Sequence, residues 1–297
     1  MSENRRVLIT GISGYLGSHL ARSLLGKGFE VHGLIREESD LSLLGEACEQ
    51  VLLHTFHGKT EGLIDIIKQV EPETVFHLAS LFRASHVTAD VVPLVESNIL
   101  FGAQLLEAMS VTGVKNLVNT GTLWQNYNGE AYNPVALYSA TKEAFETLIR
   151  FYTETDKLRA ITLKLTDTFG PKDARRKIFN LIVKASESPE SFGMTGGDQL
   201  IDIVYVDDVV SAFEVAREAL EKGDFKNRVR LVSTGAPITV KSLVATFEKV
   251  SGRKVPVEWG KLPYRPREMF TPWQSDPILE NWKPQVTLED GIRSILK

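Results

Sequence analysis

The sequence predicts an α/β fold in which a doubly wound parallel sheet is combined with a smaller C-terminal region. Three observations support this fold class. Short apolar runs rich in β-branched residues alternate with helical patterns from the N-terminus onward. The runs show no polar alternation, which is typical of strands buried on both faces of a parallel sheet. A glycine-rich turn, TGISGYLG, joins the first predicted strand to the first predicted helix.

The first part of the chain is predicted to consist of strands separated by helices. We expect strands at 6–10, 30–35, 50–54, 74–78, 116–120 and 160–165. Helical patterns cover 15–28, 61–70, 91–110 and 137–155. This alternation indicates βαβ units, which form a parallel sheet covered by helices on both faces.

After Gly170-Pro171 the alternation becomes less regular. The expected elements there are a helix at 176–188, a glycine-rich turn at 193–197, a strand that leads into a helix near Val206, a strand at 229–232, a helix at 239–251 and a proline-rich segment at 256–277. We therefore predict a first domain at 1–170, to which the chain returns at about 201–233, and a second region at 171–297.

The composition is that of an ordinary globular protein, with 43% hydrophobic and 24% charged residues and a net charge of −4. This charge gives no indication of a nucleic-acid partner. The N-terminal segment MSENRRVLITG is too polar for a signal peptide, and no apolar run approaches the ~20 residues that span a bilayer. The single cysteine, Cys48, excludes a disulfide within the chain and fits a reducing compartment. We expect a cytoplasmic protein with no membrane partner.

The turn Thr10–Gly17 has the spacing of a phosphate-binding loop. Its glycines, Gly11, Gly14 and Gly17, follow the pattern GxxGxxG. Glycines at this spacing permit a tight turn, a close approach of the backbone to a pyrophosphate, and close contact between helix and strand. The helix N-terminus adds free N–H groups and a partial positive charge. The context favours a dinucleotide site, with an ordinary structural turn as the alternative.

The end of the second strand indicates which dinucleotide binds. An acidic residue at this position would bind a free ribose 2′-hydroxyl, but the strand ends Leu34-Ile35-Arg36. An arginine suits a 2′-phosphate, so NADP(H) is favoured and NAD(H) is the alternative. The competing interpretation is a solvated surface arginine beside Glu37 and Glu38.

The segment LYSATK places Tyr138 and Lys142 one helical turn apart, on the same face. A nearby ammonium is expected to lower the phenol pKa from ~10 toward the working pH. Such a tyrosine can exchange a proton with a carbinol oxygen while hydride moves to or from a nicotinamide. Thr122, just past the strand 116–120, is placed to hydrogen-bond the same oxygen. Downstream of a dinucleotide-binding turn, these three residues predict a catalytic site.

Several motifs together resemble the extended short-chain dehydrogenase/reductases, a superfamily of nucleotide-sugar epimerases, dehydratases and reductases. They are TGISGYLG, VFHLAS, Asn98 in ESNILFGAQLLEA, TGTLW, YSATK, FGP at Phe169–Pro171, and YVDDV. The C-terminal NWKPQVTLEDGI is similar to the closing segment of that superfamily, so the resemblance covers essentially the whole chain.

This resemblance implies an NAD(P)-dependent oxidoreductase with Thr122, Tyr138 and Lys142 as its catalytic triad. It also implies that the first domain is an NADP-binding Rossmann domain and that the second region binds substrate. His77 lies at a strand end and is expected only to pack. The implied cofactor-binding residues are Gly11, Ser13, Gly14, Tyr15, Leu16, Gly17, Arg36, Leu78, Ala79, Ser80, Asn98 and Thr120.

The residues after Thr122 restrict the reaction. Sugar 4,6-dehydratases have Thr-Asp-Glu at the position of TGTLW, whereas this chain has Leu123 and Trp124 there. The epimerase-reductases that make GDP-fucose need a cysteine and a histidine in the pocket; here the cysteine lies near the third strand and no histidine follows His86. The reactions that are not excluded are simple ketone reduction and 4-epimerisation. Arg36 favours reduction, because reductases usually use NADPH.

The finer resemblance is to CDP-abequose synthase-like 4-ketoreductases of 3,6-dideoxyhexose synthesis. The resemblance lies in NTGTLWQNY, YNPVALYSATKEAFE and GGDQLIDIVYVDD. It implies reduction of a nucleotide-linked 4-keto-deoxyhexose. The alternatives are a nucleotide-sugar 4-epimerase with tightly bound NAD, a reductase of a non-sugar carbonyl, and a non-catalytic cofactor sensor, although sensors on this fold typically lose the tyrosine or the lysine.

Four residues are predicted to contact the nucleotide sugar. Asn180 matches a substrate-contacting position of the superfamily, and Arg265 and Arg267 suit bidentate contacts to a diphosphate. Trp124 is either a wall of the sugar pocket or a core residue. The basic run 172–177 is a further candidate for substrate binding, with a solvated face as the alternative.

By the same resemblance, the helices at 91–110 and 137–155 are expected to form a homodimer contact.

Overall fold

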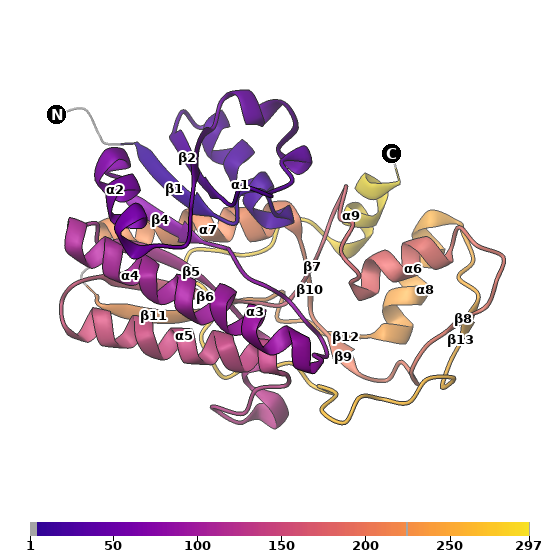
Figure 1. Ribbon diagram of the computed structural model, residues 1–297. Helices are drawn as coiled ribbons and strands as arrows, with labels where there is room; N and C mark the ends of the chain where they lie inside the picture. The colour runs from indigo at the N-terminus through magenta and orange to yellow at the C-terminus, as the bar shows by residue number, and fades with distance from the viewer. Residues whose placement is uncertain (1–4, 224, 297) are drawn as a thin grey trace.

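A computed structural model describes residues 5–223 and 225–296. Its centre is a seven-stranded parallel sheet with the strand order β11-β6-β5-β4-β1-β2-β3 (Figure 1). The strands are β1 (Arg6–Thr10), β2 (Glu30–Ile35), β3 (Leu52–Thr55), β4 (Thr74–His77), β5 (Asn116–Thr122), β6 (Arg159–Leu165) and β11 (Asn227–Val232). The predicted doubly wound α/β fold is confirmed.

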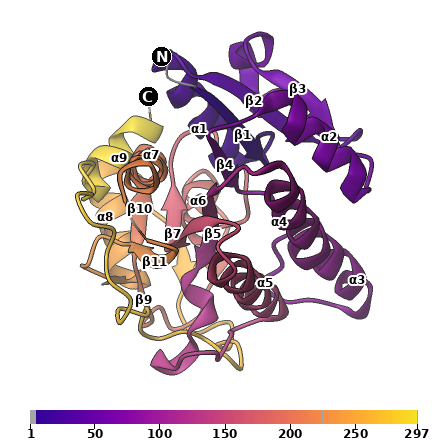
Figure 2. The ribbon, with the colours of Figure 1, turned by 90° about the vertical axis from the view of Figure 1, so that its left-hand side faces the viewer.

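Helices cover both faces of this sheet, as the end-on view in Figure 2 shows. One layer contains α1 (Tyr15–Gly26) and α7 (Val206–Lys222). The other contains α2 (Thr60–Val70), α4 (Phe101–Thr112) and α5 (Leu137–Glu154). Each layer has its own apolar core, because every strand of a doubly wound sheet buries side chains on both faces. Phe213 of α7 belongs to the first core and Phe145 of α5 to the second.

Short helical turns complete the first domain. They are η1 (Ser42–Glu49), η2 (Thr88–Asp90), α3 (Val91–Val95), the π-helical η3 (Glu96–Leu100), η4 (Leu123–Gln125) and η5 (Tyr127–Gly129). The single helix predicted at 91–110 is thus interrupted by a π-helical turn. Strand β5 extends two residues beyond the predicted end at Thr120, and β3 begins two residues after the predicted start at 50.

The helical run Thr88–Thr112 differs from the expectation that no apolar run could span a membrane. By length and composition alone it is apolar enough to do so. Such a run is weak evidence for a membrane span, since core helices of globular proteins pass the same test. Here its second half, α4, packs between α2 and α5 and contributes Leu105, Leu106 and Met109 to the core.

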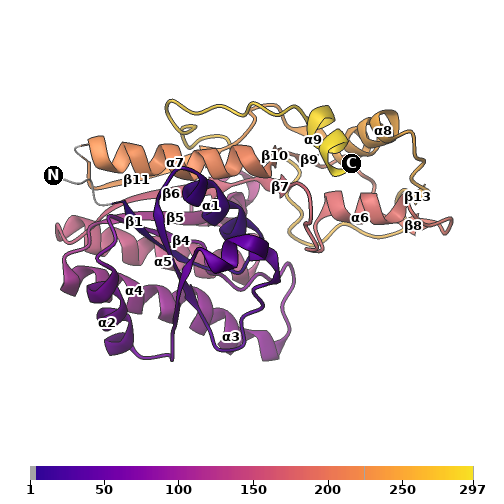
Figure 3. The same ribbon diagram turned by 90° about the horizontal axis from the view of Figure 1, so that it is seen from above.

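The smaller region lies beyond the carboxyl ends of the central strands (Figure 3). It contains α6 (Ile178–Ala185), α8 (Val240–Ser251), α9 (Leu288–Ile295) and the paired strands β7 (Asp167–Phe169) with β10 (Ile203–Tyr205), β9 (Leu200–Ile201) with β12 (Ile238–Thr239), and β8 (Phe192–Gly193) with β13 (Val257–Glu258). Helix α9 was not expected from the sequence. Phe169, Phe179 and Phe247 are packed in the core of this region. The predicted domain boundary near residue 170 falls between β7 and α6.

Candidate active site

A cavity of about 420 Å³ lies where the carboxyl ends of β1, β4, β5 and β6 face the smaller region. A second cavity, of about 460 Å³, continues from it toward the end of β2. The two share Gly11, Gly14, Leu78 and Ser80 in their walls. Ligands of open α/β sheets bind in this crevice outside the carboxyl ends of the strands. The two cavities together form one elongated candidate site.

The glycine turn between β1 and α1 forms the shared wall of both cavities. Gly11 has a φ of +71°, and a Cβ at this position would lie 2.6 Å from the backbone nitrogen of Ala79. A Cβ on Gly17 would collide with the carbonyl oxygen of Gly11. Gly14 caps α1, and its N–H donates to the Gly11 carbonyl over 3.0 Å. The first turn of α1 holds no acidic residue, so the helix N-terminus is left available to an anion.

Thr120 contributes an unsatisfied polar atom to the first cavity. Its hydroxyl is buried and has no hydrogen-bond partner among the described residues, and Thr120 belongs to the cavity wall. Buried polar atoms in native proteins nearly always have a partner, so an orphan in a cavity wall indicates a place where a ligand binds. Together with a turn that only glycines can form, this residue fits a dinucleotide site.

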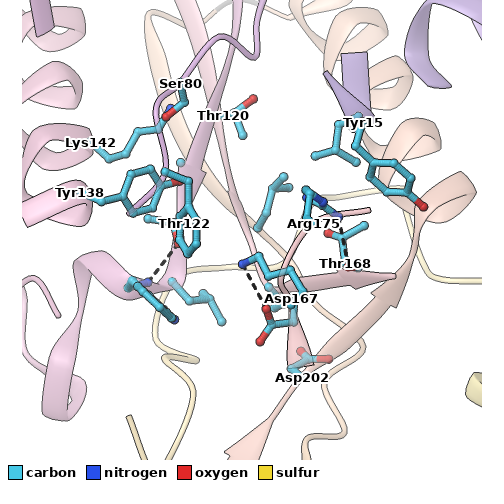
Figure 4. A pocket seen from close by; sticks show the side chains of 18 of the residues that line it. Tyr15, Ser80, Thr120, Thr122, Tyr138, Lys142, Asp167, Thr168, Arg175 and Asp202 are labelled. Atoms are coloured by element: carbon cyan, nitrogen blue, oxygen red, sulfur yellow. Dashed lines mark hydrogen bonds and ion pairs between the residues drawn. The ribbon is translucent and has the colours of Figure 1, made fainter. Parts of the chain in front are cut away.

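Tyr138 and Lys142 lie on the first turns of α5 and both line the cavity, as predicted (Figure 4). Ser139 accepts a hydrogen bond from the Ala136 N–H over 2.9 Å and so starts this helix. Burial raises the pKa of the Tyr138 phenol to about 12, while a hydrogen bond from Ser80 and the charge of Arg175 act in the opposite direction. The expectation that Lys142 would lower this pKa is wrong, because the loss of solvation dominates.

Lys142 is only 3% exposed, and burial lowers the pKa of its ammonium to about 8. Across residues 5–223 and 225–296 the structure gives it no ion-pair partner. Such a lysine can reorient its donors toward a ligand without breaking an existing bond. The neighbouring His77 is fully buried, and burial followed by the Lys142 charge lowers its pKa to about 3. His77 is therefore neutral, and it contacts Thr10 and the rings of Phe101 and Phe145 as a packing residue.

Thr122 is the last residue of β5 and faces the same space as Tyr138 (Figure 4). Its hydroxyl accepts a hydrogen bond from the Trp124 N–H over 3.3 Å, which begins the turn η4. The parallel sheet brings β5 and the start of α5 to the same edge, although Tyr138 comes sixteen residues after Thr122 in the chain. The three predicted catalytic residues thus lie together.

The wall opposite the glycine turn is aromatic and basic. Trp124 lines the cavity, its ring 5.6 Å from that of Phe82. The ammonium of Lys177 lies 4.5 Å from the Phe82 ring centroid, and the Arg265 guanidinium lies 5.0 Å from that of Trp124. Arg265 is also held by Glu268 through two bonds of 2.9 Å. These contacts place Trp124 and Arg265 at the cavity, and of the two interpretations of Trp124 the position in the cavity wall is the one observed.

Other predicted residues lie elsewhere. Asn98 is buried behind Ser80 and is absent from both cavity walls; its amide bonds to Ser80, Leu81 and Thr141. Asn180 donates to the Arg175 carbonyl over 2.9 Å and does not line the first cavity.

Arg267 is likewise outside the first cavity, since it bonds to Asn133 and to the Pro134 carbonyl. Arg36 lines the second cavity at the end of β2. The remaining predicted cofactor residues, Ser13, Tyr15, Leu16, Leu78 and Ala79, line one or both cavities.

Two features of the cavity wall were not predicted from the sequence: Phe82, and the individual residues of the basic run 172–177 that line it. Phe82 lies in an irregular loop after β4, where no pattern marked it. Arg175 lies 4.4 Å over the Tyr15 ring and is held by two bonds of 2.7 Å to Asp173. Its place at the cavity, and that of Lys177, follows from the chain path after β7, which brings the basic run back toward the glycine turn.

Comparison with known proteins identifies the fold family. Residues 7–230 match the NAD dependent epimerase/dehydratase family. The chain belongs to this family. It is therefore an NAD(P)-dependent enzyme of the extended short-chain dehydrogenase/reductase type, as the motifs predict.

The match to individual relatives is weak in identity but extends over nearly the full chain. The chain is 23% identical to the CDP-abequose synthase of Salmonella muenchen, over 99% of this chain and 97% of the relative. It is 26% identical to the CDP-abequose synthase of Yersinia pseudotuberculosis, over 90% and 91%. Among solved structures, the UDP-glucose 4-epimerase of Thermus thermophilus in complex with NAD superposes with a TM-score of 0.83 at 26% identity, covering 98% of this chain and 97% of that one.

Proposed function

We propose that this enzyme uses NADPH to reduce a nucleotide-linked 4-keto-deoxyhexose to the 4-hydroxy sugar. The observation that carries the proposal is that Tyr138, Thr122 and the glycine turn line one cavity, where burial also acts to keep the phenol protonated. A protonated phenol is the form that a reduction requires, because the carbonyl oxygen gains a proton. The relatives named CDP-abequose synthase support the substrate class.

Thr122, Tyr138 and Lys142 each have a separate role in the proposed reaction. When bound, NADPH would supply the hydride that adds to the carbonyl carbon. Thr122 donates a hydrogen bond to the carbonyl oxygen and orients it. Tyr138 gives its proton to that oxygen, and the Ser80 hydrogen bond and the Arg175 charge, which act to lower the pKa of the phenol, favour the phenolate that is left. The Lys142 ammonium has donors free for the hydroxyls of the nicotinamide ribose.

The carboxylates at the cavity are already engaged, which argues against dehydration. Asp167 pairs with Lys177, and Glu268 holds Arg265. Asp202 accepts hydrogen bonds from Ser233 and from both the N–H and the hydroxyl of Thr234. None of them follows Thr122, where an acid/base pair for the elimination of water would be needed.

We propose NADP(H) rather than NAD(H) as the cofactor because of Arg36. Its side chain is 72% exposed at the rim of the second cavity, and its ion pair with Glu38, at 3.3 Å, is solvated. A solvated pair of this kind contributes at most about 1 kcal/mol, so a phosphate can displace Glu38. The Ser39 hydroxyl, which accepts from the Arg36 N–H, is a second group at the same rim.

Two of the four proposed substrate contacts line the first cavity, and two do not. Trp124 and Arg265 line the cavity and are retained as sugar and diphosphate contacts. Arg265 would have to exchange one or both of its bonds to Glu268 for phosphate oxygens. Asn180 and Arg267 lie outside the first cavity and bond to other protein groups, so the first cavity does not support them as contacts.

The decisive experiment follows nicotinamide absorbance during incubation with a nucleotide-4-keto-deoxysugar, with NADPH and NADH in parallel. Stoichiometric loss of NADPH that is absent in Tyr138→Phe supports the reductase. Conversion of a nucleotide sugar with no net loss of cofactor would replace this proposal by a 4-epimerase, the activity named for the Thermus thermophilus enzyme. A reductase of a non-sugar carbonyl would consume NADPH only with a ketone that carries no nucleotide.

We also propose a cytoplasmic homodimer. Val91, Val92 and Val95 on α3, Leu100 on η3 and Phe151 on α5 are exposed apolar side chains on the helices that were expected to form the contact. Apolar patches of this kind on a globular protein often mark an interface. Sedimentation of the wild type as a single 33 kDa species would overturn the dimer.

A further inference from the structure

We infer that Gln125 is a positioning residue, which holds the Thr122 hydroxyl as a hydrogen-bond donor toward the reacting carbonyl and ties it to the helix of Tyr138. The inference rests on the proposed function for the identity of the carbonyl. Its geometry does not depend on that function, because every contact involved lies within the chain.

The side-chain amide of Gln125 is fully buried and uses its donors and its acceptor. Its Oε1 accepts from the Thr122 N–H over 2.9 Å. Its Nε2 donates to Glu143 over 2.7 Å and to Glu146 over 2.6 Å. A flipped amide would point its oxygen at two carboxylates, so only one orientation of the side chain is compatible with its surroundings.

The bonds around Thr122 decide what its hydroxyl can do. Thr122 and Gln125 form a capping box, in which the threonine hydroxyl accepts from the turn and the glutamine side chain accepts from the threonine N–H. A hydroxyl has one hydrogen to donate. Among the described residues this hydroxyl only accepts, from the Trp124 N–H, and donates to no group, so its hydrogen is left for the cavity that Thr122 lines.

Gln125 also links two elements that carry the chemistry. Thr122 ends β5, whereas Glu143 and Glu146 lie on α5 directly after Lys142 and one turn beyond it. One buried amide therefore spans the gap between the orienting threonine and the helix of the proton donor. Bonds to charged partners in a buried setting are stronger than neutral ones, which favours a fixed distance.

The surroundings leave little room for Gln125 to move. A Cβ on Gly121 would lie 3.0 Å from the Gln125 Oε1, so the glycine of TGT makes space for the amide. Behind it, Lys164 bonds to Asn126 and to Asp276, each over 3.0 Å. Burial raises the pKa of Glu146; the charge of Lys164 favours its ionised form, whereas Glu143 and Asp276 oppose it.

A double-mutant cycle separates positioning from a purely structural role. Gln125→Leu keeps the volume roughly but removes the amide. In the otherwise wild-type enzyme we expect it to lower kcat about tenfold to a hundredfold and to leave the Kd for NADPH within about twofold. In a Thr122→Ala background the further loss should shrink to about threefold or less, since no hydroxyl remains to be oriented. Additive losses in the two backgrounds would overturn the inference.

Variants of Glu146 and of a second buried glutamine that does not contact Thr122 provide matched controls. Glu146→Gln keeps an acceptor for Gln125 and should retain most of kcat, whereas Glu146→Leu should resemble Gln125→Leu. Gln199, whose amide bonds to Thr195, is another buried glutamine, and Gln199→Leu should lower stability without the loss of kcat. Equal losses of kcat in Gln199→Leu and Gln125→Leu would show that stability alone is responsible.

Amide hydrogen exchange tests the same bonds without turnover, so failure of the proposed function is distinguishable from failure of this inference. Gln125→Leu should speed exchange at Thr122 and Trp124 by about tenfold or more and leave Leu117, on the same strand, unchanged. Unchanged exchange at Thr122 would refute the anchoring, whichever carbonyl the enzyme reduces.

Discussion

The ring of Phe82 meets the phenol ring of Tyr138 edge to face, with centroids 4.9 Å apart and planes inclined by 78°. Phe82 comes from the loop after β4, and Tyr138 comes from α5. The contact covers one side of the tyrosine ring and adds to the burial that raises the pKa of the phenol. Its edge-to-face geometry is the one that aromatic pairs prefer.

Phe82→Ala is predicted to weaken substrate binding and to lower the pKa of Tyr138 toward its ordinary value. The substitution removes an aromatic ring from the cavity wall, and it also removes the side chain that shields the Tyr138 phenol from water. KM for the keto sugar should rise about twofold to tenfold, which corresponds to the ~0.5–1.5 kcal/mol of an aromatic contact. Steady-state kinetics across pH would check this. An unchanged KM would mean that the substrate does not contact Phe82.

Tyr138→Phe is predicted to abolish proton donation while preserving the fold, because only the hydroxyl is removed. We expect kcat to fall about 10²- to 10⁴-fold, the range of a general acid. The Kd for NADPH, measured by fluorescence titration, should change less than about threefold. A variant that still turns over at a tenth of the wild-type rate would point to a different proton donor.

Arg36→Gln is predicted to raise KM for NADPH about tenfold to a hundredfold and to leave KM for NADH nearly unchanged. The reason is the loss of a charge-assisted contact to the 2′-phosphate, worth about 1.5–3 kcal/mol. Glu38→Gln is the matched control: it removes the carboxylate that pairs with Arg36 and should keep or improve NADPH binding. Equal effects of Arg36→Gln on KM for both cofactors would exclude Arg36 as the residue that binds the 2′-phosphate of NADPH.

Lys142→Met is predicted to change how stability depends on pH. In the folded protein the ammonium loses its proton near pH 8, whereas an unfolded lysine keeps it to about 10.5. Between these values the unfolded state binds more protons, so stability rises with pH. The wild type should gain about 3 kcal/mol relative to Lys142→Met across this window.

Urea unfolding at several pH values measures this difference. Lys59→Met, at an exposed position, serves as the control and should run parallel to the wild type. A constant difference between the wild type and Lys142→Met from pH 8 to 10.5 would contradict the prediction.

The fold and the glycine turn could be predicted because both depend on local patterns. Buried parallel strands need β-branched apolar runs, and Gly11 needs a positive φ. The pKa of Tyr138 could not be predicted, because it depends on how completely neighbours from other elements bury the phenol. The roles of Phe82 and Gln125 depend on contacts between distant segments, for which the sequence holds no short-range signal.

Asn98 also shows that a sequence motif does not predict the tertiary contacts of its residues. Its motif was visible, but its four hydrogen bonds to Ser80, Leu81 and Thr141 are tertiary and place it behind the cavity rather than in its wall. The motif thus identified Asn98 as a residue of interest, but spacing along the chain could not predict its contacts or its position behind the cavity wall.

Helix α5 carries Tyr138, Lys142, Glu143 and Glu146 within its first three turns. A rigid displacement of α5 against the sheet would take the proton donor with it. Through Gln125 it would also pull on Thr122, so the two hydroxyls would tend to move together. Thermal motion of the helical layer would then change the width of the cavity more than the distance between the Thr122 and Tyr138 hydroxyls. Such a site can open for a bulky nucleotide sugar and still present an unchanged pair of hydroxyls when it closes.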